Sequence, residues 1–178
     1  FELGDKWIIS LSNKVAKEVS DNLDKYELSL AADKIYDFTW SNFCDWYIEM
    51  VKPRLYGEAG VEKDTALYTL QYVLKKILKL LHPFMPFITE EIYSYVETEH
   101  KLIVADWPVF EEKDSYEVEE NEIEIVMSAI KAIRNTRSEM NVPPSKKARL
   151  LVVTEGNTEA IFVKSEGYFK TLSSVSGL

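Results

Sequence analysis

Apolar residues recur at three- and four-residue spacing along most of this 178-residue chain, which is the pattern of amphipathic helices around a common core. The first helix is predicted over about residues 4–24, where apolar side chains stand at positions 8, 11, 15 and 19. Asp5 lies in its first turn, where a carboxylate suits the positive end of the helix dipole.

The second helix is predicted over about residues 28–52, with Pro53 and Gly57 ending it. This stretch is rich in aromatic residues, and most of them fall on or beside its apolar stripe. We therefore expect them to pack in the core rather than to stack on a ligand. Tyr36 and Trp40 are the two whose exposure the pattern leaves open.

Prolines mark the boundaries of the next two helices. A third helix is predicted over about residues 62–82, because Pro83 disfavours helical geometry in the residue before it. Pro86 then opens a fourth helix over about residues 87–96. The two helices must meet at a sharp corner.

Residues 101–110 are too short and too limited by proline for a helix, and an extended stretch is predicted there. A fifth helix is predicted over about residues 117–140, and Pro143 with Pro144 closes it. The third to fifth helices complete a set that can pack as an antiparallel bundle.

The hydrophobic period changes near the end of the chain. A β-branched apolar run with a polar start predicts a strand over residues 148–153. Asn157 or Thr158 can cap a short helix that follows, and another is predicted near residues 166–173.

Together these elements predict a mainly α protein, an antiparallel helix bundle followed by a small α/β unit. We place the bundle at residues 1–144 and the α/β unit at residues 145–178. The chain begins with Phe1 rather than methionine, and its last residues form no clear terminal element. We therefore expect an excised piece of a longer chain, in which the α/β unit is cut short.

Composition indicates how large the core can be and where in the cell the chain functions. Hydrophobic residues make up 46% of the chain and aromatic residues 12%, which is enough for one or two closely packed units. Cys44 is the single cysteine, so an intramolecular disulfide is excluded, and we expect a small buried residue in a reducing compartment. No stretch approaches the roughly 20 apolar residues of a membrane span. We expect no membrane partner and a cytoplasmic location.

The net charge of −9 argues at first against a nucleic-acid partner, because phosphate binding relies on Lys and Arg. The charge is, however, unevenly distributed. Residues 111–124 hold eight acidic residues against one lysine, whereas residues 131–149 hold six basic residues against one acid. A chain polarised in this way remains compatible with RNA.

Catalytic and metal sites are not predicted in this chain. One cysteine with two distant histidines, His82 and His100, cannot supply a zinc ligand cluster, and the six glycines form no phosphate-binding loop. We expect the His82 imidazole to bond the last carbonyls of the third helix. Glu90 and Glu91 point in different directions on their helix, so helix-start electrostatics explains them better than acid–base catalysis.

On a helical wheel, one sector of the first helix collects three lysines, an indole and a hydroxyl beside the buried stripe. The residues are Lys6, Trp7, Ser10, Lys14 and Lys17. Aromatic stacking with cations nearby is how unstacked bases of RNA loops are commonly bound. The alternative is that Trp7 borders the core and the lysines form a solvated face.

Arg134 and Arg137 fall among apolar residues on the wheel of the fifth helix. Charge on an apolar face requires a partner. Either these arginines pair internally with carboxylates or contact another domain, which the pattern favours, or they project past the bundle to bind an anionic partner such as RNA.

Five runs of the sequence resemble the valyl-tRNA synthetase family of class I aminoacyl-tRNA synthetases, over nearly the whole chain. They are residues 5–8 (DKWI), 43–49 (FCDWYIE), 52–57 (KPRLYG), 80–93 (LLHPFMPFITEEIY) and 133–147 (IRNTRSEMNVPPSKK). The HPFMPF run is shared more loosely by the isoleucine and leucine enzymes. The NVPPSKK run points more narrowly to the valine enzyme.

This resemblance implies a helical anticodon-binding domain of the class I synthetase type, lying between a catalytic core and a C-terminal arm. Such a domain binds the anticodon loop of valine tRNA isoacceptors, while the distant core uses ATP, with magnesium, to charge the tRNA with valine. Trp7 resembles the family's aromatic residue that stacks on anticodon bases, with Lys6 beside it. Neither class I signature occurs here, so catalysis is expected in the parent chain only.

The sequence departs from the family at residues 10–13, where Ser-Leu-Ser-Asn replaces the usual Ser-Arg-Leu-Asn. One expected phosphate contact is therefore in doubt. Two alternatives remain open: the same domain of an isoleucine-type synthetase, or a structural helix bundle that mediates domain or protein contacts.

Overall fold

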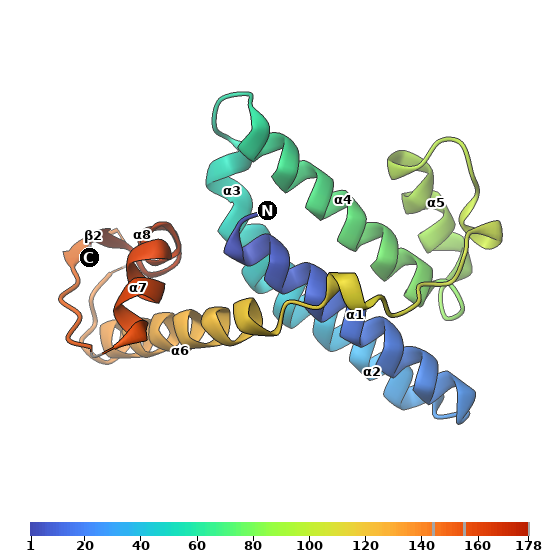
Figure 1. Ribbon diagram of the computed structural model, residues 1–178, viewed down its shortest axis with the longest axis horizontal. Coiled ribbons are helices and arrows are strands. Elements are labelled where there is room, and N and C mark those ends of the chain that lie inside the picture. The colour runs from blue at the N-terminus through green and yellow to red at the C-terminus, as the bar shows by residue number, and fades with distance from the viewer. Residues whose placement is uncertain (144, 155, 178) are drawn as a thin grey trace. The chain divides into compact units, whose positions relative to one another are not determined.

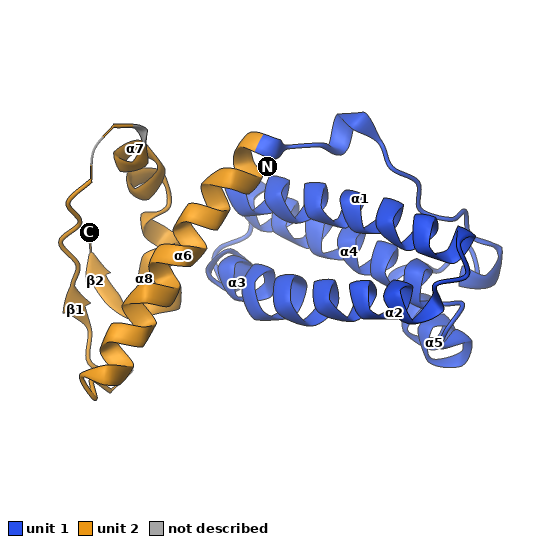
Figure 2. Cartoon of the chain, turned by 90° about the horizontal axis from the view of Figure 1, so that it is seen from below, with its two compact units in different colours: residues 1–117 blue, residues 118–178 orange. Residues whose placement is uncertain are grey.

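The structure, a computed structural model, describes residues 1–143, 145–154 and 156–177. It confirms the predicted mainly α fold, a helix bundle followed by a small α/β unit. The chain forms two compact units, residues 1–117 and 118–178 (Figure 2). This division falls after Glu117, the first residue of α6, whereas the predicted domain boundary follows α6 at Pro144, which lies outside the described residues. That boundary stays a prediction.

Unit 1 is a bundle in which α1 packs against both α2 and α4 (Figure 1). Its helices are α1 (Leu3–Asp24), α2 (Leu28–Asp37), α3 (Glu49–Leu55), α4 (Val61–Leu81) and α5 (Pro86–Val96). The predicted first, third and fourth helices agree with these bounds within one or two residues. Strong 3.6-residue periodicity and the flanking prolines explain this agreement.

The predicted second helix is continuous, but it consists of an α-helical, a π-helical and a second α-helical segment. A π-helical segment, η1 (Phe38–Ile48), joins α2 to α3, and wide turns of this kind are rare in proteins. The prediction that Pro53 ends the helix is wrong, because Pro53 lies inside α3, which ends at Leu55. Proline removes only its own N–H donor, and the helix continues just two residues beyond it.

Backbone and side-chain hydrogen bonds both hold the corner between α4 and α5, where the carbonyl of Leu81 accepts from the backbone N–H groups of Phe84 and Met85. The Nδ1 atom of His82 lies 2.9 Å from Oγ1 of Thr89, so the predicted carbonyl contact of His82 is replaced by a bond to a hydroxyl of α5. Glu90 accepts hydrogen bonds from the backbone N–H groups of Leu102 and Ile103, at 2.9 Å and 3.0 Å. Glu90 thus anchors the segment that follows α5, a role that was not predicted from its place at the start of the helix.

The next segment was predicted to be extended over residues 101–110, but a 3₁₀ turn interrupts that range and a second one follows it. These are η2 (Leu102–Val104) and η3 (Glu112–Asp114). Leu102 is buried with Leu78 and Tyr93 in a small apolar cluster. The segment is thus tied to α4 and α5 before it passes toward α1.

Unit 2 contains nearly all of α6 (Glu117–Glu139) and a small α/β arrangement. The remaining elements are β1 (Ala148–Arg149), α7 (Asn157–Lys164), α8 (Glu166–Ser173) and β2 (Val175–Gly177). The two strands pair in parallel. Phe162 of α7 and Phe169 of α8 meet edge to face, with ring centroids 5.3 Å apart.

Two predictions about this unit are wrong. The strand predicted over residues 148–153 ends at Arg149, and Leu151 and Val153 are 77% and 99% exposed. The last residues, predicted to form no element, provide the partner strand β2. A strand needs a neighbour to satisfy its backbone, and β2 offers only three residues to pair.

Three further expectations concern composition. Cys44, the single cysteine, is half-buried rather than fully buried, and this partial burial, with the charge of Asp45, raises the pKa of its thiol. Within the described residues, no helix is long and apolar enough to cross a membrane. The same residues contain no group of three His, Cys, Asp or Glu side chains that could hold a metal ion.

Candidate nucleic-acid interface

The face of α1 predicted to contact RNA lies against residues 105–116. We call these residues the covering segment. Asn13 exchanges two hydrogen bonds with the backbone of Glu111, donating at 2.7 Å and accepting at 3.0 Å. The indole N–H of Trp107 donates to Oγ of Ser20 at 2.8 Å. These contacts join residues 87 and 98 positions apart, so they fix the covering segment along α1.

Three of the proposed RNA contacts touch this segment. Oγ of Ser10 accepts a hydrogen bond from the backbone N–H of Tyr116 at 2.8 Å. The ammonium groups of Lys6 and Lys17 lie 5.6 Å and 5.7 Å from the ring centroids of Tyr116 and Phe110. A cation–π contact at this distance leaves the positive charge in place, so Lys17 remains able to attract an anion.

Trp7 and Lys14 complete the predicted set on α1. Trp7 is only 3% exposed, so its indole is enclosed and a base could stack on it only after the surrounding side chains moved. Lys14 is half-buried, as is Lys6, whereas Lys17 is exposed. Among these five residues, Lys17 is therefore the most accessible to a partner.

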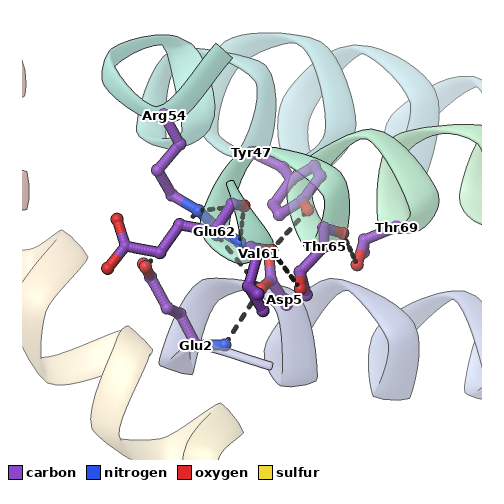
Figure 3. A network of polar contacts seen from close by, with 8 residues as sticks. All are labelled: Glu2, Asp5, Tyr47, Arg54, Val61, Glu62, Thr65 and Thr69. Atoms are coloured by element: carbon purple, nitrogen blue, oxygen red, sulfur yellow. Dashed lines mark hydrogen bonds and ion pairs between the residues drawn. The ribbon is translucent and has the colours of Figure 1, made fainter. Parts of the chain in front are cut away.

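A polar network that the sequence did not predict fixes the start of α1 (Figure 3). The carboxylate of Asp5 is fully buried and accepts hydrogen bonds from the Tyr47 hydroxyl at 2.7 Å and from Nη1 of Arg54 at 2.9 Å and 3.0 Å. It also accepts from the backbone N–H of Glu2 at 2.9 Å, and Nη2 of Arg54 donates to the carbonyl of Glu62. The network joins α1 to η1, α3 and α4.

The electrostatics of this network suit a structural role. Burial is the main cause that raises the pKa of Tyr47, and the charge of Asp5 adds to it. Burial alone would lower the pKa of Arg54, but the hydrogen bond to Asp5 and its charge outweigh that effect and raise it. A carboxylate that accepts hydrogen bonds from three elements in this way positions the helices around it.

The aromatic residues of the second predicted helix divide as expected. Phe43, Trp46 and Tyr47 are buried, which confirms their predicted place in the core. Tyr36 and Trp40 are 62% and 54% exposed, and their ring centroids lie 6.4 Å apart. The turn-by-turn spacing alone could not decide the exposure of these two rings, because they flank the stripe.

The two arginines of α6 bind backbone carbonyls within unit 2. Nε of Arg134 donates to the carbonyl of Leu172 at 2.7 Å. Nη2 of Arg137 donates to the carbonyls of Pro143 and Lys146, at 3.1 Å and 2.6 Å. The prediction favoured internal pairing with carboxylates or contact with another domain, and the acceptors of these hydrogen bonds are backbone carbonyls. These contacts orient the two guanidinium groups.

A family model described as the anticodon-binding domain of tRNA ligase matches residues 5–152, so the chain belongs to this family of helical domains. Proteins similar to this chain include valine–tRNA ligases, which confirms the resemblance found in the sequence. That of Clostridium acetobutylicum is 49% identical over 100% of this chain, and those of Clostridium perfringens and Clostridium tetani are 45% and 48% identical over 99%. The chain spans 20% of the length of each of these relatives.

Proposed function

We propose that this chain recognises the anticodon loop of valine tRNA isoacceptors as one domain of a valine–tRNA ligase. The observation that carries the proposal is the similarity along the entire chain to proteins named valine–tRNA ligase, at 45–49% identity for three of them. The match of residues 5–152 to an anticodon-binding domain model supports it. The remaining domains would use ATP, with magnesium, to charge the tRNA with valine in the cytoplasm.

The RNA contacts that we propose lie on α1 and on the C-terminal half of α6. They are Lys6, Trp7, Ser10, Lys14, Lys17, Arg134 and Arg137. The exposure of Lys17 and Arg134 supports a direct contact with phosphates, which lysine and arginine neutralise. Because Trp7 is enclosed, its main contribution would be to hold α1 in place.

The partners of this domain within the parent chain would be its catalytic core and C-terminal arm. An isolated domain lacks the contacts that those parts make with tRNA. The measured affinity for a stem-loop should therefore be lower than that of a whole ligase, while the preference among anticodons should persist, because base contacts carry sequence specificity.

The test is a fluorescence anisotropy titration of the chain with labelled RNA stem-loops that differ only in the anticodon. We expect the valine anticodon to bind more tightly than a scrambled one, and binding to weaken steeply with added salt. Equal or absent binding to both stem-loops would remove the proposal and favour a structural helix bundle. A stem-loop with an isoleucine anticodon, if bound more tightly than the valine one, would instead indicate an isoleucine-type synthetase.

A further inference from the structure

Unit 2 contains a cavity of about 390 Å³ between the C-terminal end of α6 and the end of α8. Ligand pockets in proteins commonly have volumes of ~300–1,000 Å³, so this one is large enough for a phosphate with part of its sugar. Its lining residues are Arg134, Arg137, Ser138, Val142, Leu172, Ser173 and Ser174. We propose that this cavity binds a backbone phosphate of the tRNA, an inference that rests on the proposed function.

The first support is the way the two arginines are held. Arg134 is fixed by the carbonyl of Leu172, and Arg137 by two carbonyls through Nη2 alone, as far as the described residues show. The Nε and Nη1 donors of Arg137 therefore remain for a ligand. A guanidinium group whose orientation is already fixed loses less freedom when it binds a phosphate with paired N–H groups.

The second support is the hydroxyl groups at the same cavity. Ser173 is buried, and its hydroxyl donates to the carbonyl of Phe169 at 2.6 Å, so it holds α8. Ser174 caps α8 with φ 55 and ψ 41, a left-handed conformation that glycine adopts more easily. Backbone strain of this kind often accompanies a functional site. Ser138, which is exposed, adds a third hydroxyl to the lining.

The third support is the charge of the lining. Among the described residues around the cavity, two are arginines and none is acidic. The cavity beside Arg54 in unit 1 differs, because Glu58 and Glu62 line it and the guanidinium of Arg54 is already bound to Asp5. An anion is therefore favoured at the end of α6 and disfavoured beside Arg54.

The test compares variants in binding to a full-length valine tRNA transcript over a series of salt concentrations. Arg137→Gln should weaken binding roughly 10-fold and lower the slope of log affinity against log salt by about one. Ser138→Ala, which leaves the carbonyl contacts of Arg137 intact, should weaken binding roughly 3-fold. The matched control is Arg149→Gln, which removes an exposed arginine of β1 that does not line the cavity.

A loss in Arg137→Gln and Ser138→Ala that exceeds the loss in Arg149→Gln supports the phosphate site. Equal losses for the two arginine variants, with tight binding of the unmodified chain, would overturn the site and leave anticodon recognition standing. Should the unmodified chain bind no tRNA, the proposed function fails, and an NMR titration with inorganic phosphate decides the cavity separately. Amide shifts at Leu172 to Ser174 that disappear in Arg137→Gln would support it, and no shifts would exclude it.

Discussion

Arg54 places Nη1 2.9 Å and 3.0 Å from the two carboxylate oxygens of Asp5, which precedes it by 49 residues. The Asp5 side chain is fully buried and the Arg54 side chain is 10% exposed, so water can replace neither partner. Through this pair the first turn of α1 is fixed to α3. The stability of unit 1 should therefore depend on it.

Arg54→Met should lower the free energy of unfolding by about 3–5 kcal/mol, because it leaves a buried carboxylate without its charged partner. Urea denaturation followed by circular dichroism measures this change. The control is Lys52→Met, which breaks the pair with Glu49, whose members are 43% and 41% exposed. Exposed pairs contribute less than about 1 kcal/mol, so equal losses in the two variants would contradict the structural role of Arg54.

The Tyr47 hydroxyl should make the stability of the chain depend on alkaline pH. Its ordinary pKa is 10.0, and burial, followed by the charge of Asp5, raises the pKa in the folded chain. The folded state therefore keeps a proton that the unfolded state loses above pH 10. The contribution of Tyr47 is complete below that pH and decreases as pH rises, by up to about 1.4 kcal/mol per pH unit.

Urea denaturation at pH 9 and pH 11 tests this effect in Tyr47→Phe, which should lose less stability between the two values than the unmodified chain. The comparison variant is Tyr26→Phe, since Tyr26 is 88% exposed and should leave the pH dependence unchanged. A fall in Tyr47→Phe as steep as that of the unmodified chain would show that Tyr47 ionises normally.

The helices of this chain could be predicted from sequence because each is specified locally. The apolar period of α4 and the prolines around it act within a few residues, and α4 was placed within one residue at each end. The role of Asp5 could not be predicted in the same way. Its partners Tyr47 and Arg54 are 42 and 49 residues distant, and only the packing of α1 on α3 and η1 brings them together.

The same limit explains why the sequence could not predict what covers the α1 face, or how long β1 is. A helical wheel shows which residues share a face of α1, but not that residues 105–116 return to occupy it through Asn13 and Ser10. The extent of β1 depends on pairing with β2, which begins 26 residues after Arg149. When the partner strand is distant in sequence, the local sequence does not determine where a short strand ends, even if β-branched residues follow it.

We expect Trp7 to contribute mainly to the stability of the core. Because its side chain is 3% exposed, Trp7→Ala should destabilise the chain by about 3–5 kcal/mol, through lost burial and the cavity left behind. Urea denaturation again provides the measurement. Trp40→Ala removes an indole that is 54% exposed and should cost much less. A larger loss in Trp40→Ala than in Trp7→Ala would reverse this assignment.

Lys17 offers the clearest test of the α1 face, because its side chain is exposed and can be changed with little effect on the core. Lys17→Gln should weaken binding of the valine anticodon stem-loop roughly 3- to 10-fold and reduce the salt slope by about one, as loss of one phosphate contact requires. Lys34→Gln removes a charge from α2 that is also exposed and pairs with Glu18 at 2.7 Å, and it should change binding less. If both variants bind alike, the lysines of α1 contribute only general attraction, and the direct contacts of this domain must lie elsewhere, with the arginine-lined cavity as the next site to test.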